Sequence, residues 1–150
     1  DLNICCVHIL TKLFIKDFLK NDHGFILNVS SSAGFMPGGP LMATYYATKS
    51  YILSLSLAIY EEIRKFKSKV SISVLCPGPV KTKFNDRAGV NFSIKPLSSK
   101  KVAKISVEKM FKKQLLIIPG MMMKLSYVFS KLIPIKQQLM AIYHIQHKKR

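Results

Sequence analysis

Hydrophobic residues recur along the chain at helical spacing, in segments separated by short apolar runs. Residues 4–19 place apolar side chains three or four positions apart, which predicts an amphipathic helix. Residues 42–67 predict a longer helix, and residues 98–113 predict a third with Ser98 or Ser99 as its N-cap. The buried stripe predicted for the long helix consists of Tyr51, Leu55, Ala58, Ile59, Ile63 and Phe66.

Short apolar runs between the helices have the composition of buried strands. The first is followed by a small, polar, glycine-rich stretch over residues 31–40, and the second stops at Pro77-Gly78-Pro79, so both are followed by loops. Residues 81–96 are predicted to form a further polar loop. The predicted strands are residues 25–30, 70–76 and 115–118.

The order of these elements indicates the fold class. Helices and strands alternate along the chain, which favours an α/β fold with a parallel, doubly wound sheet covered by helices on both faces. In such sheets ligands bind at the carboxyl ends of the strands. The loops that follow Ser30 and Cys76 leave two of those ends, so a functional site is expected there.

The charge is concentrated in the second part of the chain. The 150 residues carry a formal net charge of +17, and residues 91–150 hold 13 basic side chains and 1 acidic one. Such a charge favours an anionic partner. No zinc finger, RNP-type or GXXG pattern is present, so no specific nucleic-acid binding is expected. The four histidines lack metal-ligand spacing, and no metal site is predicted.

The basic stretch from 121 to 150 is also rich in apolar residues. No window in it holds about 18 uncharged apolar residues, so a membrane-spanning helix is not predicted. Two interpretations stay open. The stretch is either a helix that packs on protein or a segment that makes peripheral contact with a membrane surface.

Tyr45 and Lys49 are the first residues with recognisable chemistry. They are four positions apart in the predicted long helix and therefore lie on one face, one turn apart. An ammonium group near a phenol favours the phenolate, which would let Tyr45 act as a proton donor and acceptor. The pair alone is common by chance, but Ser30, Ser31 and Ser32 end the preceding strand, where a hydroxyl could reach the same point.

At these positions the sequence resembles the short-chain dehydrogenase/reductase (SDR) family, whose members have a Rossmann-like fold. The matching segments are Asn-Val-Ser-Ser-Ser-Ala-Gly at 28–34, Tyr-Tyr-Ala-Thr-Lys at 45–49 and Leu-Cys-Pro-Gly-Pro-Val-Lys-Thr at 75–82. Asn3 stands eight residues before Thr11, as an active-site Asn does in the family. The likeness extends from residue 1 to about residue 90. Within it, the motif sequences are most similar to those of bacterial general short-chain oxidoreductases.

The resemblance implies a role for each matching residue. Tyr45 corresponds to the catalytic acid/base, and Lys49 to the residue that lowers the pKa of that tyrosine and holds the nicotinamide ribose. Ser31 corresponds to the hydroxyl that binds the substrate carbonyl, and Asn3 to the residue that positions a proton-relay water. The loop expected to hold the nicotinamide carboxamide and the adjacent phosphate contains Pro77, Gly78, Val80 and Thr82.

The sequence departs from the family pattern in three places. Ser31 and Tyr45 are fourteen residues apart, one more than the commonest spacing, so Ser30 and Ser32 remain alternatives to Ser31. Cys6 stands where a glycine is frequent. No glycine-rich turn for the cofactor pyrophosphate occurs in the sequence.

These departures predict an incomplete Rossmann-like sheet that lacks the N-terminal nucleotide-binding half. We expect residues 1–120 to be the C-terminal catalytic part of an SDR domain and residues 121–150 to be a basic, apolar helical extension. Residues 83–98 would be the substrate loop.

The implied activity is hydride transfer between NAD(P) and a small-molecule carbonyl or alcohol. We expect a slight preference for NADPH over NADH, little activity from these 150 residues alone, and a homo-oligomer at full length. The expected location is cytoplasmic, with membrane association as an alternative. The competing hypothesis is an inactive product that acts through its basic apolar tail at a membrane or a protein partner.

Overall fold

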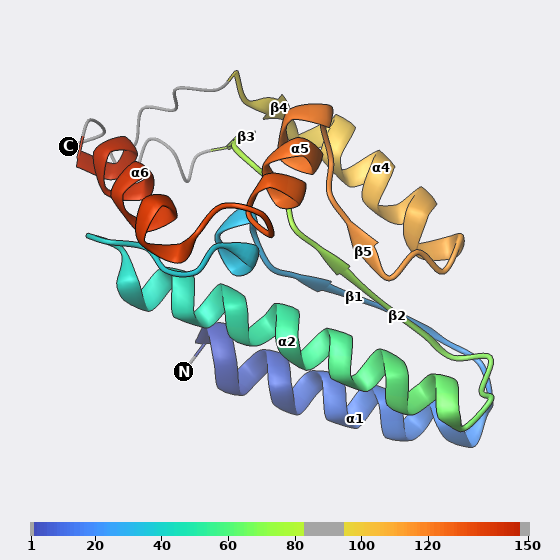
Figure 1. The fold of residues 1–150 in the computed structure, drawn as a ribbon. Coiled ribbons are helices and arrows are strands. Elements are labelled where there is room, and N and C mark those ends of the chain that lie inside the picture. Colours follow the sequence, from blue (N-terminus) through green and yellow to red (C-terminus); the bar gives the residue numbers. More distant parts are fainter. Residues whose placement is uncertain (1, 83–94, 148–150) are drawn as a thin grey trace.

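A parallel three-stranded sheet forms the centre of the molecule (Figure 1). The computed structural model describes residues 2–82 and 95–147. Strands β1 (Phe25–Val29), β2 (Ser71–Leu75) and β5 (Leu116–Ile117) lie in the order β1-β2-β5. In the first pair, Phe25 is opposite Ser71 and Val29 is opposite Leu75. All three predicted strands are confirmed, as is the α/β class.

Helices cover both faces of this sheet. A π-helix, η1 (Leu2–Cys6), leads into α1 (Val7–Lys20), which lies beside α2 (Ala43–Lys65) on one face, while α4 (Ser99–Phe111) covers the other (Figure 1). Ser98 is the N-cap of α4, and its hydroxyl accepts a hydrogen bond from the Lys101 amide.

The central strand is buried along its whole length because both of its faces are covered. Ile72 packs with residues of α1 and α2, whereas Leu75 packs with Val102 of α4. Ser71 and Ser73 alternate with Ile72 and Val74 in this strand, but two-sided burial covers the serines as well as the apolar residues.

The remaining elements lie around the carboxyl ends of the strands. They are the 3-10 helix η2 (Ser32–Phe35), the strands β3 (Val80–Lys81) and β4 (Leu97–Ser98), and the helices α5 (Met121–Phe129) and α6 (Ile135–His147). The prediction of a loop over 81–96 is wrong at Lys81, because β3 and β4 form a short parallel pair. A strand of two residues is too short to show an alternating pattern in the sequence, so β3 and β4 could not be predicted from it. Residues 83–94, which hold most of the expected substrate loop, lie outside the described residues.

The stripe predicted for α2 is only partly right. Ile63 is buried, but Phe66 is 75% exposed, and Ala58 is also exposed. Apolar residues occur on several sides of this helix, so periodicity alone does not identify its inner side. Packing against both the sheet and η2 does so, and the residues buried on α2 are Ile52, Leu53, Ser56 and Ile63.

A buried polar network joins α1, β1 and α2. Thr11 Oγ1 donates to Asn28 Oδ1 at 3.2 Å, and Asn28 Nδ2 donates to Ser56 Oγ at 3.0 Å. Ser56 Oγ in turn donates to the Ile52 carbonyl at 2.8 Å. Because buried polar groups are costly unless paired, this chain of bonds fixes how the two helices sit on the strand.

Candidate functional site

Helix α2 places Tyr45 and Lys49 together in its first two turns. Lys49 Nζ lies 5.9 Å from the centre of the Tyr45 ring and donates a hydrogen bond to the Val29 carbonyl, 3.3 Å away at the end of β1. Partial burial of the Lys49 ammonium lowers its pKa. The contact with Val29 holds the lysine against the end of the strand, where ligands bind in sheets of this type.

The loop after β1 is fastened to the same turn of α2. Ser30 Oγ donates to the Lys49 carbonyl at 2.6 Å, and Ser50 Oγ donates to the Gly34 carbonyl at 3.0 Å. An added Cβ at Gly34 would lie 2.5 Å from Ser30 Oγ and 2.8 Å from the Lys49 carbonyl oxygen. A glycine is therefore needed at position 34 for the loop to approach the helix this closely.

The three adjacent serines have different surroundings. Ser30 is buried, and its hydroxyl proton is used by the Lys49 carbonyl. Ser31 is partly exposed and has an extended backbone, and its Oγ accepts a hydrogen bond from the Ala33 amide. Ser32 is the first residue of η2. The observed bonds therefore use the hydroxyl proton of Ser30 and leave those of Ser31 and Ser32 available to an acceptor in the described residues.

A second loop, at the end of β2, meets the first. The Pro77 carbonyl accepts a hydrogen bond from the Ser32 amide at 2.8 Å. Gly78 lies against Met123 of α5, Val80 is in β3, and Thr82 is exposed just after it. The structure thus brings Pro77 next to the loop that carries Ser31.

Cys76, which precedes this loop, is fully buried. Burial raises the pKa of its thiol to about 11, so it is protonated at neutral pH. A protonated, buried thiol is a poor nucleophile, so Cys76 acts as a small apolar residue of the core. No group of three or more metal-ligating side chains occurs in residues 2–82 and 95–147.

Asn3 lies in η1, the element that leads into α1 and contacts α2. Its side chain is exposed. Nearby, His8 Nδ1 and the Tyr51 hydroxyl are 2.6 Å apart, which links α1 to α2 two residues beyond Lys49. The structure therefore places Asn3 on η1, an element that contacts the helix carrying Tyr45 and Lys49.

Tyr46 is set apart from Tyr45 by a contact that sequence reasoning missed. Gln146 Nε2 of α6 donates to the Tyr46 hydroxyl at 2.9 Å, across 100 residues of sequence. Burial raises the pKa of Tyr46. A separation of this length leaves no local signal, so the bond could not be foreseen from spacing.

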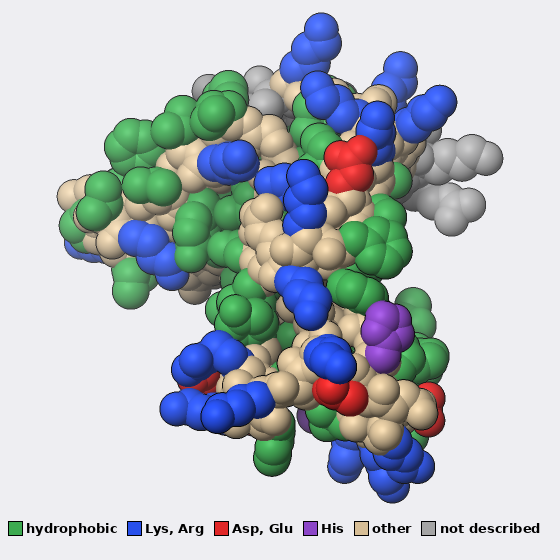
Figure 2. All heavy atoms as spheres, turned by 90° about the vertical axis from the view of Figure 1, so that its right-hand side faces the viewer, with side chains coloured by type: hydrophobic (Ala, Val, Ile, Leu, Met, Phe, Trp, Pro, Cys, Tyr) green, Lys and Arg blue, Asp and Glu red, His purple; other side chains and the backbone are tan. Residues whose placement is uncertain are grey.

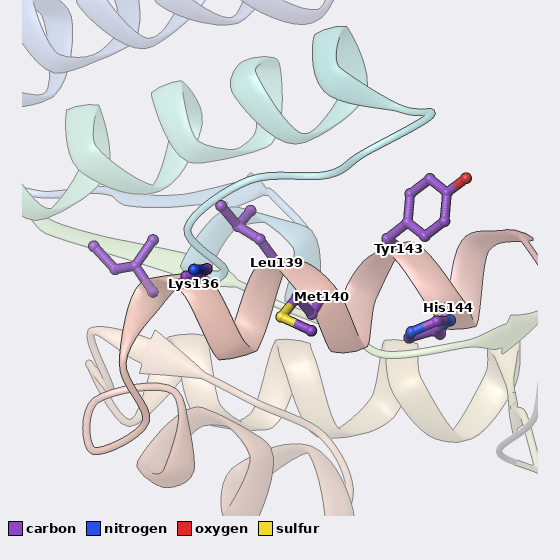
Figure 3. A pocket seen from close by; sticks show the side chains of 6 residues that line it. Lys136, Leu139, Met140, Tyr143 and His144 are labelled. Atoms are coloured by element: carbon purple, nitrogen blue, oxygen red, sulfur yellow. The ribbon is translucent and has the colours of Figure 1, made fainter.

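Two hollows lie beside α6. A shallow one of about 600 Å³ lies along α6 itself, where Leu139 and Tyr143 lie on one side of the helix and Met140 and His144 on the other (Figure 3). A second, of about 350 Å³, is enclosed by η2, α2, α5 and α6. In the described part of the chain, neither Tyr45 nor Lys49 lines them.

The family model of the short chain dehydrogenases matches residues 1–91, which include both strand-end loops and the Tyr45–Lys49 pair. The chain belongs to the short-chain dehydrogenase family. This match confirms the resemblance drawn from the sequence motifs.

Curated relatives align over about half of the chain. Human 17-beta-hydroxysteroid dehydrogenase type 3 is 38% identical over 81 residues, which are 53% of this chain and 25% of that protein. The very-long-chain 3-oxoacyl-CoA reductase of Mus musculus is 33% identical over 84 residues, 55% of this chain and 26% of that protein. A 3-oxoacyl-[acyl-carrier-protein] reductase of Synechocystis is 33% identical over 82 residues, 55% of this chain and 32% of that protein.

Solved structures share the fold. A 7beta-hydroxysteroid dehydrogenase superposes with a TM-score of 0.79 at 22% identity, covering 93% of this chain and 54% of that one. A short-chain dehydrogenase from Sphingobium yanoikuyae in complex with NADPH gives 0.72 at 22% identity, with the same coverage. The chain thus spans about half the length of these structures and about a quarter to a third of the three curated relatives.

Proposed function

We propose that this chain carries the catalytic part of an NAD(P)-dependent oxidoreductase that transfers hydride between the nicotinamide and a carbonyl or alcohol. The observation that supports it is the placement of Tyr45, Lys49 and Ser31. The first two share one face of α2, and the third lies on the strand-end loop bonded to that helix.

In the proposed mechanism Tyr45 donates a proton to the carbonyl oxygen of the substrate during reduction and accepts it from the alcohol during oxidation. The Lys49 ammonium stabilises the negative charge that develops on the phenol oxygen. Its bond to the Val29 carbonyl keeps it in place between the helix and the strand. Asn3 of η1 would hold the water that resupplies the proton.

Ser31 would donate a hydrogen bond to the same carbonyl oxygen and fix its position. The amide of Ala33 supports this role, because it occupies a lone pair of Ser31 Oγ and leaves the hydroxyl proton for the substrate. A carbonyl held by two donors is polarised and oriented before the hydride arrives.

The residues present fit one end of the cofactor. Lys49 and Tyr45 would hold the nicotinamide ribose, and Pro77, Gly78, Val80 and Thr82 would hold the carboxamide and adjacent phosphate. When bound, the nicotinamide supplies or accepts the hydride. A glycine-rich turn for the pyrophosphate does not occur in this sequence. We propose that the protein uses NADPH slightly better than NADH, which assays with both cofactors would test.

The substrate class that we propose is a lipophilic ketone or 3-oxoacyl thioester. The relatives that match include reductases of 3-oxoacyl thioesters and a hydroxysteroid dehydrogenase.

A homo-oligomer remains a prediction. Exposed apolar residues of α1, such as Leu13 and Phe14, would be covered in one, and light scattering would measure it.

The test is made on the protein as its source cell produces it, after its intact mass has been measured. Reduction of a 3-oxoacyl thioester and of a steroid ketone is followed by loss of NADPH or NADH absorbance. The Tyr45→Phe variant should lose turnover by at least a hundredfold, the lower range for a general acid, while cofactor binding is nearly unchanged. Tyr46→Phe is the matched control, since its hydroxyl bonds to Gln146. Retained turnover in Tyr45→Phe would show that the assignment is wrong.

A further inference from the structure

Helix α6 buries polar side chains and exposes apolar ones. Its inner side includes Gln138 and Gln146, each 8% exposed. Gln138 Nε2 donates to the carbonyls of Ser130 and Ile133, and Gln146 donates to Tyr46. A helix on a water-exposed surface normally has the reverse arrangement. Of the large apolar residues of α6, only Ile142 is fully buried.

The outer side of α5 and α6 is largely apolar. Phe129 is 54% exposed, Leu132 is 72%, Ile135 is 63% and Met140 is 57%. Met123 and Tyr127 cover the inner side of α5 and pack against the core. Figure 2 shows hydrophobic side chains gathered at the upper left, the side of the molecule on which α5 lies. We call the exposed face of residues 121–147 the α5–α6 surface.

The charge of this surface has one sign. Lys124, Lys131 and Lys136 are exposed on it, and the sequence holds no Asp or Glu after Glu108. Three more basic residues follow at 148–150. Apolar residues flanked by lysines, without carboxylates, are the composition of helices that lie at a membrane interface.

We propose that the α5–α6 surface docks on an anionic lipid bilayer, with α5 and α6 lying in the interface. Two features of the surface select this occupant. Its lysines would meet lipid phosphates, and its apolar residues would enter the acyl boundary. A second copy of the chain would bring the same lysines face to face with no carboxylate in the surface to pair with them, which is unfavourable in a twofold contact.

The docking is peripheral. In the described residues no helix is both long and apolar enough to cross a membrane. A single such surface gives reversible binding that depends on the anionic lipid and weakens as salt is added. This proposal is independent of the oxidoreductase activity and concerns other residues than those of the Tyr45 site.

The experiment is sedimentation of the chain with vesicles of phosphatidylcholine alone or mixed with phosphatidylserine. We expect binding to the mixed vesicles only, reduced by salt. Because the whole chain is strongly basic, the decisive comparison is between two triple variants of equal charge. One changes Lys124, Lys131 and Lys136 to Gln, and the other changes Lys100, Lys101 and Lys112 of the α4 region to Gln.

The α5–α6 variant should bind roughly a hundredfold more weakly, since each Lys near an anionic surface contributes about 1 kcal/mol. The α4 variant should lose much less. Equal losses in the two variants would mean that net charge alone attracts the chain, and this would overturn the proposal. So would equal binding to neutral and mixed vesicles, or no binding to either.

Insertion of the apolar residues is tested separately by fluorescence. The sequence contains no Trp, so a single Trp reports its own surroundings. The emission of Leu132→Trp should shift to shorter wavelength with mixed vesicles, whereas Phe66→Trp, at an exposed position of the α2 C-terminus, should not shift. Circular dichroism checks that both variants are folded. If Leu132→Trp shifts without vesicles as the chain concentration rises, and light scattering shows a dimer, a second copy occupies the surface and the proposal is wrong.

Discussion

The bond between Gln146 and Tyr46 gives the sharpest test of where α6 lies. Its two atoms are 2.9 Å apart, and Gln146 is 8% exposed. Changing Tyr46 to Phe removes the acceptor and leaves the Gln146 amide unpaired in a place that water hardly reaches. Leaving a buried donor unpaired costs about 1–3 kcal/mol. Because Tyr46 is only partly buried, we expect the lower end of that range.

A double-mutant cycle isolates the bond from the packing around it. Tyr46→Phe, Gln146→Ala and the double variant are unfolded in urea together with the parent chain. We expect a coupling free energy of about 1 kcal/mol between the two positions. The control is Tyr60→Phe on the same helix, whose hydroxyl has no hydrogen bond in the described part of the chain. Additive losses would mean that α6 does not pack on α2 as the structure has it.

The pH dependence of the free energy of unfolding tests the burial of the Tyr46 phenol independently. Burial raises the pKa of Tyr46 above its ordinary value of 10.0. The folded state therefore holds this proton more tightly than the unfolded state does. The resulting stabilisation is full below pH 10 and is lost as the pH rises through the folded pKa. Tyr46→Phe should flatten this alkaline loss, and an unchanged pH profile would argue against burial of this phenol.

Two further substitutions test the scaffold of the site. Gly34→Ala should cost about 1–3 kcal/mol in the free energy of unfolding, because its Cβ would press on the Lys49 carbonyl. The control is Gly38→Ala, whose Cβ would meet only a flexible Leu side chain and which should cost less. Equal melting curves for the two variants would refute the close approach at Gly34. Asn28→Ala should lower the free energy of unfolding by about 2–4 kcal/mol, because it breaks two buried hydrogen bonds. The control is Asn21→Ala, exposed at the end of α1, which should change thermal stability little. A small loss for Asn28→Ala would mean that the buried network is not formed.

Much of the fold could be predicted because it depends on local pattern. The strands were found from short segments rich in apolar and β-branched residues, and the central one is buried on both faces. The Tyr45–Lys49 pair was found because two residues four apart on a helix must share a face. The structure places their side chains near each other on α2.

Other features depend on contacts between distant segments and left no local trace. Sequence reasoning could not set Ser30 apart from Ser31 and Ser32, because the difference rests on Ser30 donating to the Lys49 carbonyl, nineteen residues away. The inner side of α2 was misjudged at Phe66 for a related reason. Apolar residues occur on several sides of that helix, and only the position of the sheet and η2 decides which are covered.

Helix α6 shows why pattern reading is least informative at the end of this chain. The sequence predicts a helical extension over 121–150 but leaves its packing side open, and the structure places Gln138 and Gln146 on the inner side of α6. Their amide nitrogens donate to the Ser130 and Ile133 carbonyls and to the Tyr46 hydroxyl, whereas Gln138 Oε1 is buried without a hydrogen-bond partner in the described residues. Because the two glutamines occupy the inner side, most of the large apolar residues of α6 other than Ile142 are exposed in the described chain. The same inward hydrogen bonds that place α6 beside the Tyr45 helix therefore also leave most of its apolar side chains facing outward, together with its lysine, on the surface that we propose docks on a bilayer.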